Sequence, residues 1–117
     1  MNILSERLGK VVVVAPTGRI DVASAKQFHE AIDPHLKDCV NQGGALLMDL
    51  GGVDYISSAG LRELLIAAKR VGASKGRMRV CRLQPMVKEV IQISRFDLIL
   101  DISEGREEAL ALLEAAP

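Results

Sequence analysis

The sequence predicts a single α/β domain with a mostly parallel central sheet, an antiparallel hairpin at its start and about four helices. Its length is that of one domain, so we treat residues 1–117 as a single unit. Short apolar runs alternate with segments of helical periodicity, an order typical of parallel strands joined by helices. Hydrophobic residues make up 49% of the chain, but it has no Trp, one Tyr and two Phe, which predicts an aliphatic core.

The first third of the chain is expected to form a hairpin and then a long helix. Strands are predicted over residues 1–8 and 10–18, joined by a tight glycine turn. Pro16 cannot donate to a sheet ladder, so the second strand should end there or lie on an edge at that point. Residues 22–42 carry apolar side chains at three- and four-residue steps, which predicts a helix. Pro34 should kink or split that helix.

The rest of the chain continues as strands that alternate with helices. A run that is apolar throughout predicts a strand covered on both faces, and the glycine pair that follows it is interpreted as a turn. Later segments alternate between strand-like runs and amphipathic patterns, and the last pattern begins with glutamates, which favour a helix start. We predict strands at 45–50, 77–83 and 98–102, and helices at 61–71, 85–94 and 104–116.

Composition argues against several functional classes. Fifteen basic and fifteen acidic residues give a net charge of zero, so we expect no nucleic-acid partner. No apolar run approaches the ~20 residues of a membrane span, and the start has no signal-peptide pattern, so we expect a cytoplasmic protein without membrane insertion. Cys39 and Cys81 belong to no CxxC pair, which favours reduced, packed thiols. His29 and His35 are six positions apart, a spacing that predicts no metal site.

Two adjacent serines precede the second predicted helix, in the segment YISSAGL at residues 55–61. Ser58 is placed as the N-cap, and a simple cap at Ser57 or Ser58 is one interpretation. A catalytic serine is disfavoured, because the segment lacks the first glycine of a hydrolase elbow and no histidine lies near it in sequence. In a third interpretation, Ser58 is the substrate of a kinase. Its phosphate would be tolerated at the positive end of a helix and would repel a docked partner.

An aspartate also ends the predicted central strand, which invites comparison with phospho-receiver domains. Such domains need an acidic pair after the first strand and a lysine after the last. Here only Asp21 follows the first strong strand, and the segment LILDISEG has no lysine. We therefore reject Asp49 as a phosphoacceptor.

The segments GRID at 18–21 and LLMDLGGVDYISSAGLRELL at 46–65, in this order of elements, resemble a STAS domain. More narrowly, the chain resembles the free-standing bacterial anti-sigma factor antagonists, over almost its whole length. The resemblance implies partner switching. The unphosphorylated antagonist captures an anti-sigma factor, which is also a serine kinase with a histidine-kinase-like ATP fold. That kinase phosphorylates the antagonist, and a metal-dependent serine phosphatase resets it.

Carried over by position, the resemblance makes Ser58 the phosphorylated serine and Asp21 the acid beside it. Ser57 stands where many founding members have aspartate, and it remains the alternative acceptor. The implied binding surface also includes Glu63 and Lys69 on the exposed side of the second helix. Its other members are Asp21, Gly52, Asp54, Tyr55, Ser57, Ala59, Gly60, Leu61 and Arg62.

The resemblance implies no cofactor, no metal and no catalysis by this chain. The alternative function is that of a STAS scaffold or regulatory subunit in a signalling, secretion or membrane transport complex without a sigma factor.

Overall fold

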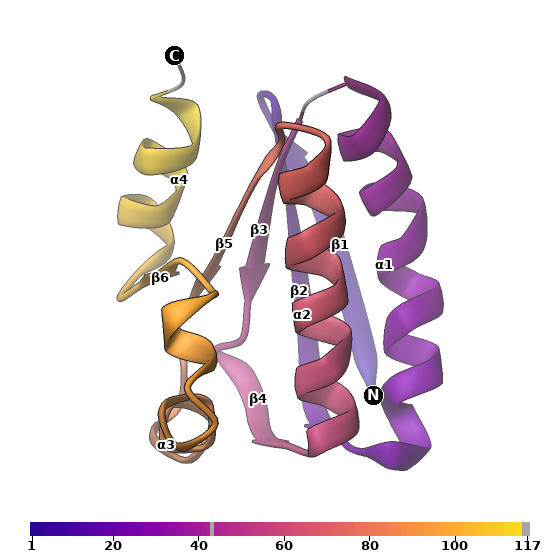
Figure 1. Ribbon diagram of the computed structural model, residues 1–117, viewed down its shortest axis with the longest axis vertical. Helices are drawn as coiled ribbons and strands as arrows, with labels where there is room; N and C mark the ends of the chain where they lie inside the picture. The colour runs from indigo at the N-terminus through magenta and orange to yellow at the C-terminus, as the bar shows by residue number, and fades with distance from the viewer. Residues whose placement is uncertain (43, 116–117) are drawn as a thin grey trace.

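One six-stranded sheet with helices on both faces makes up the computed structural model, which describes residues 1–42 and 44–115, without the side chains of 38–42 (Figure 1). The strands run in the order β1-β2-β3-β5-β6, and β4 pairs with β2. Only β1 and β2 are antiparallel, so the expected fold class is confirmed. The elements are β1 Asn2–Leu8, β2 Val11–Ile20, α1 Val22–Gln42, β3 Ala45–Asp49, β4 Gly52–Ile56, α2 Ser58–Ala73, β5 Arg77–Cys81, α3 Pro85–Ile93, the 3-10 turn η1 Phe96–Leu98, β6 Ile102–Ser103 and α4 Arg106–Glu114.

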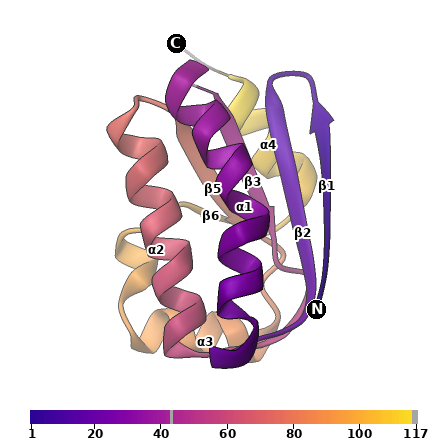
Figure 2. The same cartoon turned by 90° about the vertical axis from the view of Figure 1, so that its right-hand side faces the viewer.

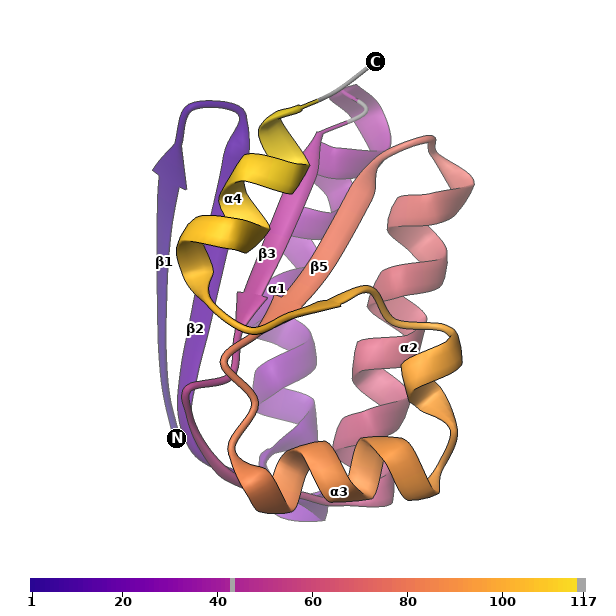
Figure 3. The ribbon, with the colours of Figure 1, turned by 90° about the vertical axis from the view of Figure 1, so that its left-hand side faces the viewer.

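The sheet separates two apolar cores. Helices α1 and α2 lie side by side on one face, α4 covers the other, and α3 lies across one end of the sheet (Figures 2 and 3). The side chains of β2 alternate between the two cores, with Val12 and Val14 in the larger one and Val11 and Val13 beneath α4. Every residue of β3 is buried, as expected for a strand covered on both faces.

Strand β4 is absent from the sequence-based prediction, which placed only a turn after β3. It pairs in parallel with the end of β2, and one extra residue, Asp54, bulges out of the pairing. The bulge brings both Val53 and Ile56 into the core although they are three positions apart. A period of two is therefore lost, which explains why the pattern did not read as a strand.

Pro16 and Pro34 differ in their effect on the secondary structure. Strand β2 continues through Pro16 to Ile20, but Pro16 lies where β2 has left β3 and has not yet met β4, so it is on a local edge as expected. The expected split at Pro34 is wrong, because α1 runs without interruption through it. Pro34 and Glu30 are both exposed, so water can bond the carbonyl that the proline ring leaves unpaired.

The strand predicted at 98–102 is largely wrong. Residues Phe96–Leu98 form η1, and only Ile102–Ser103 pair with β5. A left-handed backbone at Arg95 ends α3, and the amides of Ile99 and Leu100 then bond the carbonyl of Phe96 instead of a ladder. The apolar letters of this segment therefore belong to a tight turn.

Cys81 is a free, buried thiol, and burial, with the nearby Asp49 charge, raises the pKa of that thiol to about 11. The side chain of Cys39 lies outside the described part of the chain. Within the described residues, no cluster of three metal-ligating side chains occurs, and no helix is long and apolar enough to cross a membrane.

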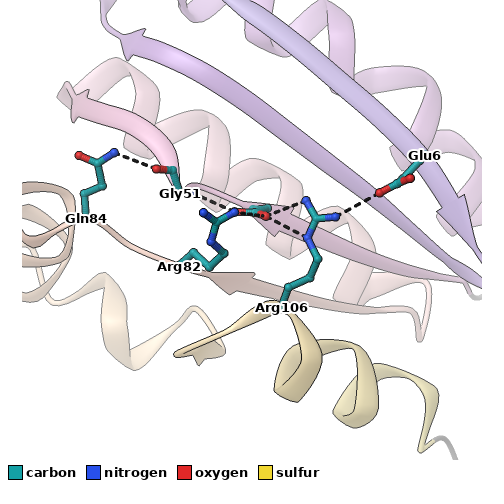
Figure 4. Close-up of polar contacts among 6 residues, drawn as sticks. Glu6, Gly51, Arg82, Gln84 and Arg106 are labelled. Carbon is teal, nitrogen blue, oxygen red and sulfur yellow. Dashed lines mark hydrogen bonds and ion pairs between the residues drawn. The ribbon is translucent and has the colours of Figure 1, made fainter.

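A buried aspartate at the end of β3 joins four parts of the fold. Asp49 is 2% exposed and accepts hydrogen bonds from Arg82 at 3.0 Å and from Arg106 at 2.7 Å (Figure 4). Arg106 begins α4 and also pairs with Glu6 of β1 at 3.1 Å. The Gly51 amide donates to the same carboxylate at 2.9 Å. Burial opposes ionisation, but the Gly51 amide, Arg106 and Arg82 together hold the pKa of Asp49 below its usual range.

The turn after β3 is fixed by the same cluster. Arg82 has a left-handed backbone with φ of 60°, a conformation that costs about 1–2 kcal/mol and that its pairing with Asp49 offsets. A Cβ at Gly51 would lie 2.6 Å from the Arg82 guanidinium carbon, so a side chain there would displace the guanidinium that pairs with Asp49. Gln84 donates to the Gly51 carbonyl at 2.8 Å. The start of β4 is thereby held at a defined place.

Replacing Asp49 with asparagine should lower the free energy of unfolding at pH 7 by about 2–4 kcal/mol, because two guanidinium groups lose their counter-charge. The pKa of Asp49 is lowered in the fold, so its stabilising effect is complete above the ordinary value of 3.8 and is lost as pH falls through the folded-state pKa. Urea unfolding of both proteins should therefore show a gap at pH 7 that narrows below pH ~4.

Asp54→Asn is the matched control, since Asp54 is exposed and makes no ion pair with the described residues. It should change stability by no more than about 0.5 kcal/mol. A gap for Asp49→Asn that stays constant down to pH 3 would contradict the assigned charge pairing.

Candidate functional site

The candidate site lies where the ends of β2 and β4 lead into the first turns of α1 and α2. Ile20 and Ile56 are paired neighbours, and the Ser57 amide donates to the Ile20 carbonyl at 2.8 Å. Because both strands are parallel, the two helices start at the same end of the sheet (Figure 1). The serine pair and Asp21 therefore lie at the same end of the sheet.

Asp21 caps helix α1. Its carboxylate accepts from the Ser24 amide at 3.1 Å, and its own amide donates to the Ser24 hydroxyl at 3.0 Å. This reciprocal arrangement is a capping box. The Ser24 amide and hydroxyl, with the Arg19 guanidinium, lower the pKa of Asp21. The acid beside the serines is therefore a fixed anion at neutral pH.

An arginine that the sequence analysis did not single out joins this surface. The Arg19 guanidinium lies 4.2 Å from the centre of the Tyr55 ring and 3.6 Å from the Asp21 carboxylate. These contacts hold the tyrosine of β4 against β2 through a cation–π interaction. The segment GRID contains both charged residues, Arg19 and Asp21, two positions apart. Ser24 follows Asp21 by three positions, a spacing that indicates a helix cap.

The two serines have different roles in the fold. Ser57, not Ser58 as expected, is the N-cap of α2, and its hydroxyl accepts from the Gly60 amide at 3.2 Å. Ser58 is the first helical residue and is exposed. Its hydroxyl makes no hydrogen bond with any residue that the structure describes. Ser58 is therefore free to react with an incoming group, while Ser57 already has a structural task.

The glycine and leucine of the motif point inward. A Cβ at Gly60 would lie 2.7 Å from a methyl group of Ile20 and 2.9 Å from its carbonyl oxygen, so α2 can approach β2 only with glycine there. Leu61 is 4% exposed and belongs to the larger core. Both residues act through packing, and neither offers a side chain to a partner.

The remaining expected contact residues are on the surface. Asp54 is exposed by the bulge of β4, and Gly52 is exposed at the start of the strand, where a Cβ would lie 2.6 Å from a methyl group of Thr17. Ala59 is half-buried, and Arg62 is exposed one turn along α2. The surface thus extends from β4 over the first turns of α2.

A shallow hollow lies between α1 and α2 at this end of the helices. Its volume is ≈ 470 Å³, and Ser58 and Arg62 are on its wall. Glu63 faces it as well, but its carboxylate is bound to His29 of α1 at 2.7 Å. The full lining is Ala25, Ser58, Ala59, Arg62, Glu63 and Ile66.

This arrangement suits docking better than catalysis. A serine nucleophile needs a base within hydrogen-bond reach, and the described residues provide none for Ser58. His29 of α1 is bound to Glu63 instead. The hollow is open and has one wall of small side chains, so another protein can approach the Ser58 hydroxyl directly.

A family model and a known protein match this chain over most of its length. The family model of the STAS domain matches residues 2–109. A Bordetella bronchiseptica protein, BtrV, assigned by name as an anti-sigma factor antagonist, is 33% identical over 117 residues, which cover 99% of this chain and 97% of BtrV.

Solved structures with the same fold include an anti-sigma factor antagonist from Mycobacterium paratuberculosis. Its TM-score is 0.86 at 25% identity, with 97% of this chain and 93% of that one covered. The phosphorylated form of the Bacillus cell fate determinant SpoIIAA has a TM-score of 0.67 at 19% identity, with 94% and 97% covered. At that identity, the second likeness is evidence for the fold alone.

The division between the two serines can be tested by stability. Ser57→Ala should lower the free energy of unfolding by about 1 kcal/mol, because it removes the side-chain acceptor for the Gly60 amide. Ser58→Ala should change it by less than about 0.5 kcal/mol, because it removes only a solvated hydroxyl. Urea unfolding followed by circular dichroism measures both. Equal losses in the two variants, or a larger loss at Ser58, would contradict the assignment of the cap.

Proposed function

The chain belongs to the STAS domain family, among the anti-sigma factor antagonists, and from this premise we propose that it is a phosphorylation-controlled partner switch. In its unphosphorylated form it binds an anti-sigma factor that is also a serine kinase, so the sigma factor is released. Phosphorylation of Ser58 by that kinase ends the binding, and a metal-dependent serine phosphatase restores it. The switch acts in the cytoplasm, and the chain serves as substrate rather than catalyst.

The observation that carries this proposal is that Ser58 is exposed, whereas the neighbouring Ser57 hydroxyl is bonded as the cap of α2. A kinase must reach its acceptor hydroxyl without first breaking a structural contact. The Ser57 hydroxyl accepts from the Gly60 amide, and modifying it would disturb the cap of α2. The Ser58 hydroxyl has no such contact among the described residues and faces the open hollow. Phosphorylation of Ser58 therefore breaks no hydrogen bond within the described part of the fold.

The proposed reaction is an ordinary phosphoryl transfer. The Ser58 oxygen bonds to the γ-phosphorus of ATP, the bond from that phosphorus to the oxygen of the departing ADP breaks, and a base of the kinase takes the hydroxyl proton. The product carries close to two negative charges where there was a neutral hydroxyl. The added charge repels any partner that presents a carboxylate, and it opposes the docking of an apolar patch.

Two relatives support the proposal. BtrV carries the name of an anti-sigma factor antagonist and matches nearly the whole of this chain. SpoIIAA, a protein of the same fold, is known in a phosphorylated form. The first supports the class of target and the second supports the compatibility of this fold with a phosphate.

The experiment is a binding comparison between the wild-type protein and Ser58→Glu, used as bait in lysate of the source cells. Wild-type protein should retain a kinase of the histidine-kinase-like ATP fold, and Ser58→Glu should lose at least about tenfold of it, because a carboxylate mimics part of the phosphate charge. With the purified kinase and ATP, intact mass should rise by one phosphate in wild-type protein and in Ser57→Ala, but not in Ser58→Ala.

Ser57→Asp is the matched control, because it places a carboxylate one residue earlier, at a position where aspartate is a preferred cap. It should retain the kinase better than Ser58→Glu. Equal recovery of one partner by wild-type protein and Ser58→Glu would refute the switch and favour a scaffold role in a larger complex.

A further inference from the structure

Arg62 is a positively charged residue of α2, one helical turn after Ser58. It is exposed, lines the same hollow, and makes no ion pair or hydrogen bond with the residues that the structure describes. The acid next to it in sequence, Glu63, is bound to His29 of α1 at 2.7 Å. By contrast, Arg19 and Arg70 are each bound to an aspartate.

The geometry of the helix directs Arg62 toward Ser58. Residues four positions apart lie on one face of a helix, with Cβ atoms about 5–6 Å apart. Helical side chains lean toward the N-terminus, so a long side chain at Arg62 reaches back over the turn that holds Ser58. An anion N-terminal to a cation at this spacing is the more favourable order. The guanidinium also matches the geometry of phosphate oxygens better than an ammonium does.

We propose that Arg62 binds the phosphate of phosphorylated Ser58 within the same chain, as an intramolecular clamp that neutralises part of its charge. The inference rests on the proposed phosphorylation of Ser58 and names a regulatory residue for it. Binding of the phosphate takes the Arg62 guanidinium away from the docking surface. Phosphorylation then both adds an anion to that surface and removes a cation from it.

Other charges near the hollow do not compete for this role. Glu63 opposes the phosphate but is held by His29, and Asp21 is held by Arg19 and Ser24. On α1, Lys26 pairs with Glu30 at 4.0 Å. Arg62 is the one guanidinium that lines the hollow without a partner among the described residues.

The test measures the second ionisation of the phosphate directly. Phosphoserine is incorporated at position 58 during translation, and its phosphorus NMR signal is titrated with pH. The second pKa of a phosphoserine is near 6, and a bound guanidinium lowers it because it favours the dianion. We expect this pKa to be about 0.1–0.4 lower in the wild-type chain than in Arg62→Gln. Arg62→Lys should fall between them.

Lys69→Gln is the matched control. Lys69 is exposed on the same face of α2, eleven positions after Ser58, and so about 16 Å further along the helix. That distance exceeds the Debye length of about 10 Å at 0.1 M salt, so the variant loses one positive charge without moving the phosphate pKa. At 1 M salt the difference between wild-type protein and Arg62→Gln should largely disappear.

Identical titrations for wild-type protein and Arg62→Gln would overturn the clamp, and so would an equal effect of Lys69→Gln. Neither result depends on a kinase, because the phosphate is installed during synthesis. Failure of the kinase to modify Ser58 would instead refute the proposed function and leave the titration unaffected. The two failures are thus distinguishable.

Discussion

The ionised Asp49 is the constraint on which the arrangement of this molecule depends. A carboxylate that is 2% exposed is unfavourable unless its charge is matched, and here two arginines and a backbone amide match it. Those partners come from the end of β5, the start of α4 and the turn after β3. Through Arg106, the cluster also reaches Glu6 of the edge strand β1. One buried charge therefore ties β3 to the end of β5, to the turn after β3, to the edge strand β1 and to α4, the helix that covers the smaller core.

The same cluster reaches the serines through the main chain. Gly51 is held by Asp49 on its amide and by Gln84 on its carbonyl, so β4 starts from a fixed point. The bulge at Asp54 then turns Ile56 into the core, and the Ser57 amide closes onto the end of β2 at 2.8 Å. A site built in this way needs no large rearrangement to bind a partner, because its backbone is determined by interactions on the opposite side of the turn. In the proposed switch, control comes from phosphorylation of the exposed Ser58 side chain.

Sequence reasoning succeeded where a pattern was local and failed where it was not. Strands β2 and β3 and the main helices were readable because continuous apolar runs and three-to-four spacing report burial directly. The partners of Asp49 lie 33 and 57 residues away, so no local pattern announces them. Strand β4 was missed because its bulge removes the period of two. Whether Ser57 or Ser58 is the cap depends on the backbone angles of a single residue, and helix ends are not fixed by sequence to that precision.

In the proposed switch, the N-cap Ser57 and the phosphorylated Ser58 are different residues, and this has an electrostatic consequence. The resembled family often has aspartate at the cap position, and a carboxylate there would face a phosphate on the next residue across a few ångströms. Ser57 forms the same hydrogen bond to the Gly60 amide without a charge. The N-terminus of α2 therefore keeps its positive potential for the proposed phosphate, and Glu63, the acid next to Arg62 in sequence, is held by His29. With a neutral cap, and with Arg62 making no ion pair among the described residues, α2 itself would stabilise a phosphate on Ser58. In the proposed switch, the stability of the phosphorylated form would therefore depend on this chain as well as on its partners.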